Sequence, residues 1–174
     1  MIQKVFSITY QLSKRLYFRL RYKDSFVYGK IFRFRDKFRV NITSSEGKVE
    51  IGDNVFFNHD CSLHSHSRIK IGDYCMFGEN VKIYDHNHVF KDSNTPIVMQ
   101  GFSSAEVEIG DNCWIGSNVI ILKGVHIGRH SVIGAGCVIY KDIPSETSIK
   151  CKQEYIIEVI VKKSAHTNKH QELR

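Results

Sequence analysis

The stretch IGDNCWIGSNVIILKGVHIGRHSVIGAGCVIYKDIP, residues 109–144, repeats one pattern at an interval of six residues. Its marker is an isoleucine at every sixth position: Ile109, Ile115, Ile121, Ile127, Ile133 and Ile139. A period of six fits neither the 3.6-residue period of an amphipathic helix nor the two-residue period of a half-buried strand. It fits a short strand followed by a corner, laid down repeatedly.

The same period extends toward the N-terminus. The phrase VEIGDN at 49–54 returns as IKIGDY at 69–74 and as VEIGDN at 107–112. Six earlier positions carry the hexad residue: Ile51, Phe57, Leu63, Ile71, Phe77 and Ile83. Internal repeats of this kind are typical of solenoids, whose coils pair with their neighbours. The sequence therefore predicts an all-β protein, a parallel β-helix with three hexads per triangular coil.

A compact residue follows four positions after each hexad residue. The set is Val55, Cys61, Ser67, Cys75, Val81, Asn87, Cys113, Val119, Val125, Ser131, Cys137 and Ile143. Four of the five cysteines share this slot, so we expect them to pack as small hydrophobes without a catalytic or disulfide role. The glycine after most hexad residues is expected where the backbone turns tightly.

The repeat divides the chain into three parts. Residues 1–48 form a basic, aromatic segment: a helix with Val5, Leu12, Leu16 and Leu20 on one face, then an irregular strand-rich approach. Residues 49–144 form the β-helix, with coils at 51–70, 71–88, 109–126 and 127–144. The irregular stretch 89–106 is predicted to be an extruded loop that frames a binding site. Residues 145–174 hold one final element, within EYIIEVIVKK, and a polar tail.

The net charge of +7 is concentrated at the N-terminus, where residues 1–40 contain eleven basic and two acidic residues. This segment either covers one end of the fold as a basic helix or contacts an acidic partner, nucleic acid or a membrane surface. No apolar run approaches the roughly 20 residues of a membrane span, and the opening residues lack a signal peptide. The five cysteines, which show no zinc-like C-x-x-C pairing, agree with a reducing compartment. We therefore expect a cytoplasmic protein.

With these motifs, residues 49–144 resemble the hexapeptide-repeat acyltransferase superfamily, above all the galactoside, maltose and capsular-polysaccharide O-acetyltransferases. The resemblance implies a left-handed parallel β-helix, a homotrimer with active sites between subunits, and acetyl-CoA as co-substrate without a metal. It also implies a saccharide acceptor, and bacterial surface polysaccharide biosynthesis as the setting. The basic N-terminus favours an enzyme peripheral at the inner membrane face rather than one that binds nucleic acid.

The segment YDHNHVF at 84–90 stands at the end of a coil, just before the predicted loop. By resemblance, His88 occupies the place of the catalytic histidine. A neutral imidazole accepts a hydroxyl proton near pH 7 and returns it to a leaving thiolate. Asp85 or a backbone carbonyl is expected to fix the tautomer of His88, and Asp85 and His86 are expected to contact the acceptor. Asn58 corresponds to an acceptor-binding asparagine, or else satisfies backbone groups at a corner.

The resemblance also places the acetyl-CoA. Trp114, Ser117 and Ala135 are expected along the pantetheine arm, with Tyr140 and Lys141 near the nucleotide; Trp114 as a subunit contact is an open alternative. The chain departs from the family after the last coil. Many relatives have a G-x-P-A-[KR] turn there, whereas this chain reads IKCKQEY at 149–155. The usual basic contact to the nucleotide phosphates is therefore displaced, with Lys150 or Lys152 as its new place.

Three alternatives remain open. In the first alternative the protein is also an acyltransferase, but its acceptor is a sugar amine on a nucleotide-linked precursor, or serine. The pairs His64–His66 and His86–His88 also fit a zinc enzyme of the γ-carbonic-anhydrase type, because coil stacking places His66 above His86. In a third alternative the β-helix is a structural scaffold whose histidines merely stack.

Metal analysis of the purified protein tests the zinc alternative. We expect zinc far below one ion per chain, because the segment around His86 and His88 has no glutamate as proton partner. Elemental analysis by mass spectrometry after exhaustive dialysis measures this. Stoichiometric zinc that chelators remove together with activity would contradict the acyltransferase interpretation.

Overall fold

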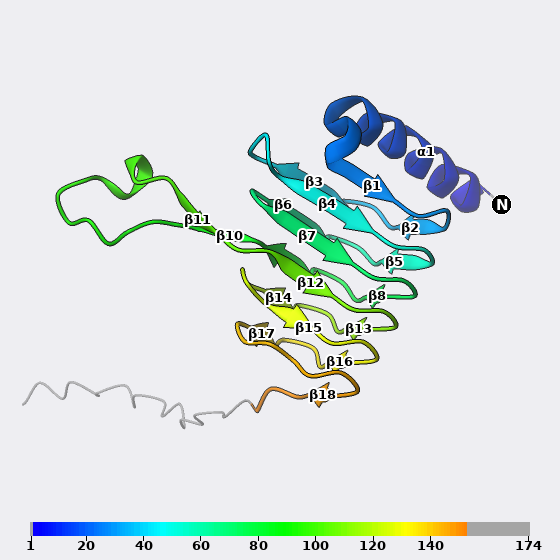
Figure 1. Ribbon diagram of the computed structural model, residues 1–174. Helices are drawn as coiled ribbons and strands as arrows, with labels where there is room; N and C mark the ends of the chain where they lie inside the picture. Colours follow the sequence, from blue (N-terminus) through cyan, green and yellow to red (C-terminus); the bar gives the residue numbers. More distant parts are fainter. Residues whose placement is uncertain (1, 153–174) are drawn as a thin grey trace, which may run out of the picture.

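The computed structural model describes residues 2–152, with side chains from residue 9 onward. The chain opens with helix α1 (Ile2–Tyr22) and a short 3-10 turn, η1 (Lys23–Ser25). The remainder winds into a solenoid of about five turns, stacked below the helix in Figure 1. The predicted β-helix with an N-terminal helical segment and one extruded loop is confirmed. The predicted final element within EYIIEVIVKK lies outside the described residues.

Parallel sheets form the three faces of the solenoid. The first face contains β1 (Phe26–Tyr28), β4 (Lys48–Ile51), β7 (Arg68–Ile71), β12 (Val107–Ile109) and β15 (His126–Ile127). The second contains β2 (Phe32–Phe34), β5 (Val55–Phe57), β8 (Met76–Phe77), β13 (Trp114–Ile115), β16 (Val132–Ile133) and β18 (Ser148–Ile149). The third contains β3 (Arg39–Ile42), β6 (Ser62–Ser65), β9 (Lys82–Tyr84), β14 (Ile120–Ile121) and β17 (Val138–Ile139).

One excursion leaves this regular winding. It contains β10 (His86–His88), the 3-10 turn η2 (Ile97–Met99) and β11 (Phe102–Ser104). The strands β10 and β11 pair with each other in antiparallel fashion and with no strand of the three faces. They form a hairpin that projects to the side of the stack (Figure 1).

The hexad residues form the core, since all twelve are buried. Strand register stacks each of them on its equivalent in the next coil, as when Ile71 pairs with Ile51 on one side and with Ile109 on the other. The rings of Phe57 and Phe77 stack with centroids 4.1 Å apart. Burial of apolar surface contributes about 25 cal/mol per Å². This continuous apolar column is therefore the main source of stability.

The glycine in each I-G-D phrase allows two coils to approach closely. A Cβ atom on Gly72 would lie 2.8 Å from the backbone nitrogen of Asp111 in the next coil. The left-handed backbone conformation comes two positions after the glycine, as at Tyr74 and Asn112, with φ of 59° and 56°. The expected tight turn at the glycine is thus corrected: the glycine is needed for coil spacing, and the residue two positions later makes the turn.

The first coil begins at Phe26, earlier than the repeat predicts. The strands β1, β2 and β3 pair in register with β4, β5 and β6, so the expected irregular approach is a complete coil. The sequence did not reveal this coil, because phenylalanine occupies slots that later coils fill with valine or cysteine. Phe32, for example, pairs with Val55, and Phe26 pairs with Val49.

Helix α1 covers the end of this first coil with an aromatic face. Phe18 is 1% exposed, and its ring centroid lies 5.0 Å from that of Phe26. Leu12, Leu16 and Leu20 lie on the opposite face and are 58%, 58% and 70% exposed. The fourth residue of that predicted face, Val5, has a side chain outside the described part of the chain. Among residues 2–152, no helix is long and apolar enough to cross a membrane.

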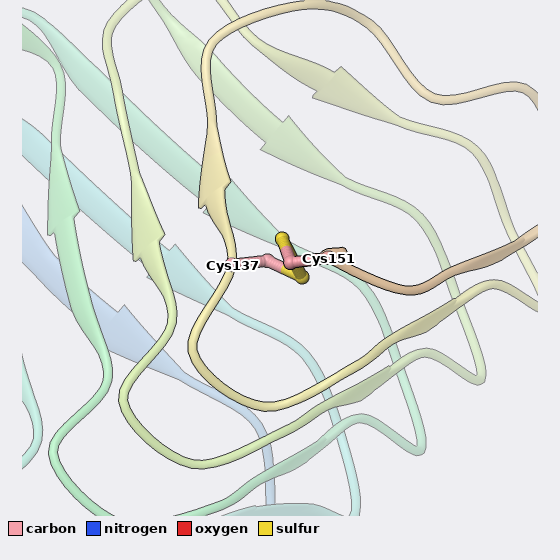
Figure 2. Close-up of a disulfide and its surroundings, with 2 residues drawn as sticks. All are labelled: Cys137 and Cys151. Atoms are coloured by element: carbon pink, nitrogen blue, oxygen red, sulfur yellow. A yellow bond between two sulfur atoms is a disulfide. The ribbon is translucent and has the colours of Figure 1, made fainter. Parts of the chain in front are cut away.

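The cysteines confirm one expectation and contradict another. Cys61, Cys75 and Cys113 are free and buried, and burial raises the pKa of the Cys61 thiol to about 11. Cys137 instead forms a disulfide with Cys151 (Figure 2), so the prediction without disulfides is wrong for this pair. After β18 the chain passes beside the preceding coil, which brings the two Cα atoms to 5.5 Å.

The aromatic cap is expected to be essential for stability. Replacing Phe18 by alanine leaves a cavity among the rings of Tyr22, Phe26, Phe34 and Phe38. We therefore expect Phe18→Ala to lower the unfolding free energy by about 3–5 kcal/mol. The midpoint of urea-induced unfolding, followed by far-UV circular dichroism, measures this. Leu16→Ala on the opposite face is the matched control and is expected within about 0.5 kcal/mol of wild type. Equal losses in the two variants would contradict the observed orientation of α1.

Candidate active site

The chain leaves the solenoid after Asp85. In the hairpin that follows, His86 pairs with Ser104 and His88 with Phe102. The backbone N–H of Ala105 donates to the Asp85 carbonyl at 2.8 Å and closes the base of the hairpin. The extruded segment predicted at 89–106 therefore starts three residues earlier. As a result Asn87, predicted to fill a slot of the coil, is exposed on β10.

The Asp85 carboxylate is fully buried and accepts four hydrogen bonds. Oδ1 accepts from the backbone N–H of His66 at 2.7 Å and from Nδ1 of His86 at 2.9 Å. Oδ2 accepts from the Ser65 hydroxyl at 2.8 Å and from the backbone N–H of Ser67 at 2.9 Å. A buried charge is tolerated only when it is satisfied in this way. The carboxylate is thereby held in one position and holds His86 in turn.

The two histidines of the hairpin have different surroundings. The side chain of His86 is 13% exposed, and its ring meets Phe102 edge to face at 5.2 Å. His88 is exposed and lies against the same ring at 4.5 Å, with no hydrogen bond from its side chain to residues 9–152. The carboxylate expected to orient His88 therefore orients His86. The role of His88 as base stays a prediction.

A second pair of histidines lies one coil away. The rings of His66 and His86 are 5.5 Å apart, as coil stacking predicts. His64 stacks on Tyr84 at 4.7 Å, and burial lowers the pKa of His64, with a smaller lowering from the charge of His86. Within the part of the chain that the structure describes, no three His, Cys, Asp or Glu side chains form a group able to hold a metal ion.

The hairpin turn is fixed by its own hydrogen bonds. The Asp92 carboxylate accepts from the Thr95 hydroxyl at 2.6 Å and from the backbone N–H of Asn94 at 2.9 Å. The Gln100 side chain donates to the carbonyls of Asp92 and Thr95 at 2.8 and 2.7 Å. These bonds give the loop a defined shape. Its tip is apolar and exposed, with Ile97, Val98 and Met99.

A groove of about 550 Å³ runs along the second face of the solenoid. Its lining contains four residues predicted to bind acceptor or co-substrate: Asn58, Trp114, Ser117 and Ala135. They come from three coils, and strand register aligns Trp114 with Val132 in the coil below. The predicted co-substrate residues Trp114, Ser117 and Ala135 are thus brought together, although 21 residues separate the first from the last.

Two backbone amides in this groove are available to a ligand. In the coil above, the N–H of Glu79 donates to the Ser117 hydroxyl at 3.1 Å. The equivalent of Ser117 in the next coil is Ala135, whose side chain has no acceptor. The N–H groups of Ser117 and Ala135 accordingly donate to no residue within the described chain. Unpaired donors of this kind suit a ligand that carries amide carbonyls.

The remaining predicted co-substrate residues lie elsewhere. Tyr140 and Lys141 follow β17 outside the groove lining, and the Lys141 ammonium lies 5.7 Å above the Tyr140 ring. Lys150 does line the groove, directly before Cys151 of the disulfide. The chain therefore has a basic residue at the groove despite the missing G-x-P-A-[KR] turn.

The groove and the histidines lie on different edges of the solenoid. In Figure 1 the hairpin projects to the left, whereas β8, β13 and β16 run down the right edge. Within the described chain, no hairpin residue lines the groove. One copy of the chain therefore does not bring the two halves of the predicted site together.

Sequence reasoning named Asp85 but missed two other residues of the site, Ser65 and Phe102. Ser65 and Asp85 stand at equivalent positions of adjacent coils, two residues after the buried Leu63 and Ile83. Neither missed residue has a signal in the repeat. The place of Ser65, two residues after a hexad residue, is also polar in other hexads, as at Asp53, Asp73 and Asp111. The contact of Phe102 with the histidines depends on the register of a hairpin in an irregular stretch.

Comparisons with known proteins agree with the repeat. A family model described as "Bacterial transferase hexapeptide (six repeats)" matches residues 106–141. Among curated protein sequences none matches the chain.

Solved structures extend the likeness to most of the chain. A hexapeptide-repeat acetyltransferase from Vibrio cholerae is 27% identical with a TM-score of 0.64, over 78% of this chain and 73% of that chain. A maltose O-acetyltransferase from Clostridium difficile 630 is 38% identical with a TM-score of 0.61, over 71% and 64% of the two chains. A galactoside acetyltransferase in complex with coenzyme A is 26% identical with a TM-score of 0.50, over 71% and 59%.

Proposed function

Because the chain belongs to the hexapeptide-repeat acyltransferase superfamily, we propose that it transfers an acetyl group from acetyl-CoA to a sugar hydroxyl. The observation that carries this proposal is the Asp85–His86 pair, an imidazole held by a buried carboxylate next to the hairpin. The names of two similar enzymes support the choice of a sugar, since one acts on maltose and the other on galactosides.

We assign the general base to His86 in place of His88. The carboxylate of Asp85 only accepts hydrogen bonds, so Nδ1 of His86 carries the proton and Nε2 is free to accept one. His86 takes the proton of the acceptor hydroxyl as its oxygen bonds to the thioester carbonyl carbon. The tetrahedral intermediate then breaks its carbon–sulfur bond, and His86 returns the proton to the sulfur of coenzyme A. His88, exposed beside Phe102, remains the alternative base.

The groove on the second face supplies the co-substrate site in this proposal. The free N–H groups of Ser117 and Ala135 donate to the amide carbonyls of the pantetheine arm. The exposed face of Trp114 packs against that arm, and Lys150 meets a phosphate group of the nucleotide. A similar enzyme with bound coenzyme A supports this class of co-substrate.

The separation of the two halves supports a homotrimer as the active form. A cyclic assembly places the hairpin of one copy beside the groove of the next and closes three identical sites. The setting that we propose is the cytoplasmic synthesis of a bacterial surface polysaccharide. Sugar amines and serine are the competing acceptors, and a thiol-release assay with each class of acceptor separates them.

The first prediction concerns the base. His86→Ala is expected to lower kcat about 10²–10⁴-fold, because a general base contributes a factor of this size. Thiol release from acetyl-CoA, measured with a panel of sugars, nucleotide-linked amino sugars and serine, reports the rate. Asp85→Asn is expected to lower kcat with little change in the KM for acetyl-CoA, since it acts through the orientation of His86.

His88→Ala is the matched control for this assay. It removes an imidazole from the same strand, and we expect a loss below about tenfold. A loss in His88→Ala as large as expected for His86→Ala, with His86→Ala near wild type, would return the base to His88. Equal thiol release by wild type and both variants with every acceptor would refute the proposed chemistry.

The second prediction concerns the shared site. His86→Ala disables the hairpin half, and Ala135→Trp fills the groove half. Each variant alone is expected to be inactive, whereas co-expressed, differently tagged chains assort into trimers that contain complete sites. Random assortment restores about a quarter of wild-type activity, because a site needs one intact half from each of two neighbours.

Two variants of the groove, Ser117→Trp and Ala135→Trp, serve as control. Their mixture is expected to stay inactive, since no site receives an intact groove. Absence of rescue in the first mixture, in trimers shown to be mixed by tandem affinity purification, would place the whole site within one chain.

A further inference from the structure

One face of α1 has no partner in the described chain. Leu12, Leu16 and Leu20 are spaced four residues apart and form an exposed stripe along the helix. Phe18 and Tyr22 face the other way, toward the first coil. Tyr17, beside the stripe, is also exposed. A contiguous apolar stripe on a soluble surface is typical of an interaction site.

The surroundings of this stripe are strongly basic. Helix α1 contains five basic residues and no acidic one: Lys4, Lys14, Arg15, Arg19 and Arg21. The Arg15 guanidinium donates a hydrogen bond to the Phe32 carbonyl. The first coil adds exposed basic side chains at Lys30, Arg33, Arg35, Lys37 and Arg39, with Asp24 and Asp36 as the acidic residues of residues 1–40.

We infer that the leucine face of α1 docks on an anionic lipid surface. The leucines enter the interface between headgroups and acyl chains, while Arg19 and Arg21 lie among the lipid phosphates. Charge selects this occupant over a second copy of the chain. Two copies packed face to face would bring two basic helices without acidic residues together, and like charges repel.

The docked helix sets the orientation of the molecule. Because Phe18 packs on the first coil and the leucines point away from it, the N-terminal end of the solenoid faces the lipid. The hairpin then projects to the side of the stack (Figure 1), and the groove lies on the second face of the solenoid. If the proposed trimer forms, its threefold axis places three such helices at one height, so three weak contacts act together.

Vesicle co-sedimentation of the full chain tests this inference. We expect binding to vesicles of phosphatidylcholine and phosphatidylglycerol and little binding to phosphatidylcholine alone. Binding is expected to weaken as salt rises, because the basic residues contribute electrostatically. The variant Leu12→Gln/Leu16→Gln/Leu20→Gln is expected to lower the partition coefficient at least about tenfold, since each leucine loses burial in the interface.

The tip of the hairpin offers a matched control. Ile97, Val98 and Met99 are also apolar and are 56%, 81% and 74% exposed. The variant Ile97→Gln/Val98→Gln/Met99→Gln is expected to bind vesicles as wild type does. Wild-type binding by the leucine variant, or a loss confined to the hairpin variant, would overturn the inference.

Sedimentation velocity separates the competing occupant. We expect wild type and the leucine variant to have the same oligomeric state, and thiol release with a soluble acceptor to be unchanged. A leucine variant that loses its assembly, with no vesicle binding by wild type, would show that a second copy covers the stripe. Failure of the acetyl-transfer assay would leave the vesicle result intact, because docking does not require the chemistry.

Discussion

The structure depends on one constraint: every inward side chain must pack on its equivalent in the neighbouring coil. Ile51, Ile71 and Ile109 make such a column on the first face, and Phe57 with Phe77 on the second. The column requires constant spacing between coils, which the absent Cβ of Gly72 permits. Because the spacing is constant, a side chain in one coil also has a fixed place relative to side chains of the next. The site inherits its geometry from this regularity.

The same constraint explains what the sequence predicts well. Inward residues need size and apolarity at a fixed interval, so the period of six identifies the twelve hexad positions directly. The period of six fails to identify a coil where another element packs on that coil and changes the size of the inward side chains. The first coil is covered by α1, and its slots contain Phe26 and Phe38, which contact Phe18, and Phe32, which packs on both. This pattern is unlike the valine and cysteine of later coils. The leucine spacing correctly predicted a shared face of the helix, but it does not indicate which face packs on the coil.

The candidate site shows the complementary case, in which function breaks the repeat. Asp85 has a buried carboxylate at a position where the next two coils have Lys123 and Lys141. Its charge is tolerated because Ser65, directly above it, and two backbone N–H groups donate to it. The hairpin starts at the next residue, so the carboxylate and the departure of the chain coincide. The sequence predicts the neighbourhood of the histidines, whereas the proposal of His86 over His88 rests on the hydrogen bond to Asp85.

The groove follows from a smaller departure from the repeat, an alanine in place of a serine at residue 135. Ser117 and Ala135 are equivalent residues of adjacent coils, and a serine at 135 would supply an acceptor to the coil above, as Ser117 does for Glu79. Alanine supplies none, so the amide of Ser117 has no partner among the described residues. The groove lies on one edge of the triangular coil, and the hairpin leaves from another edge. A change of side chain within one copy of the chain cannot bring these two edges together. In the proposed trimer, the hairpin of a neighbouring copy supplies the edge that the groove lacks.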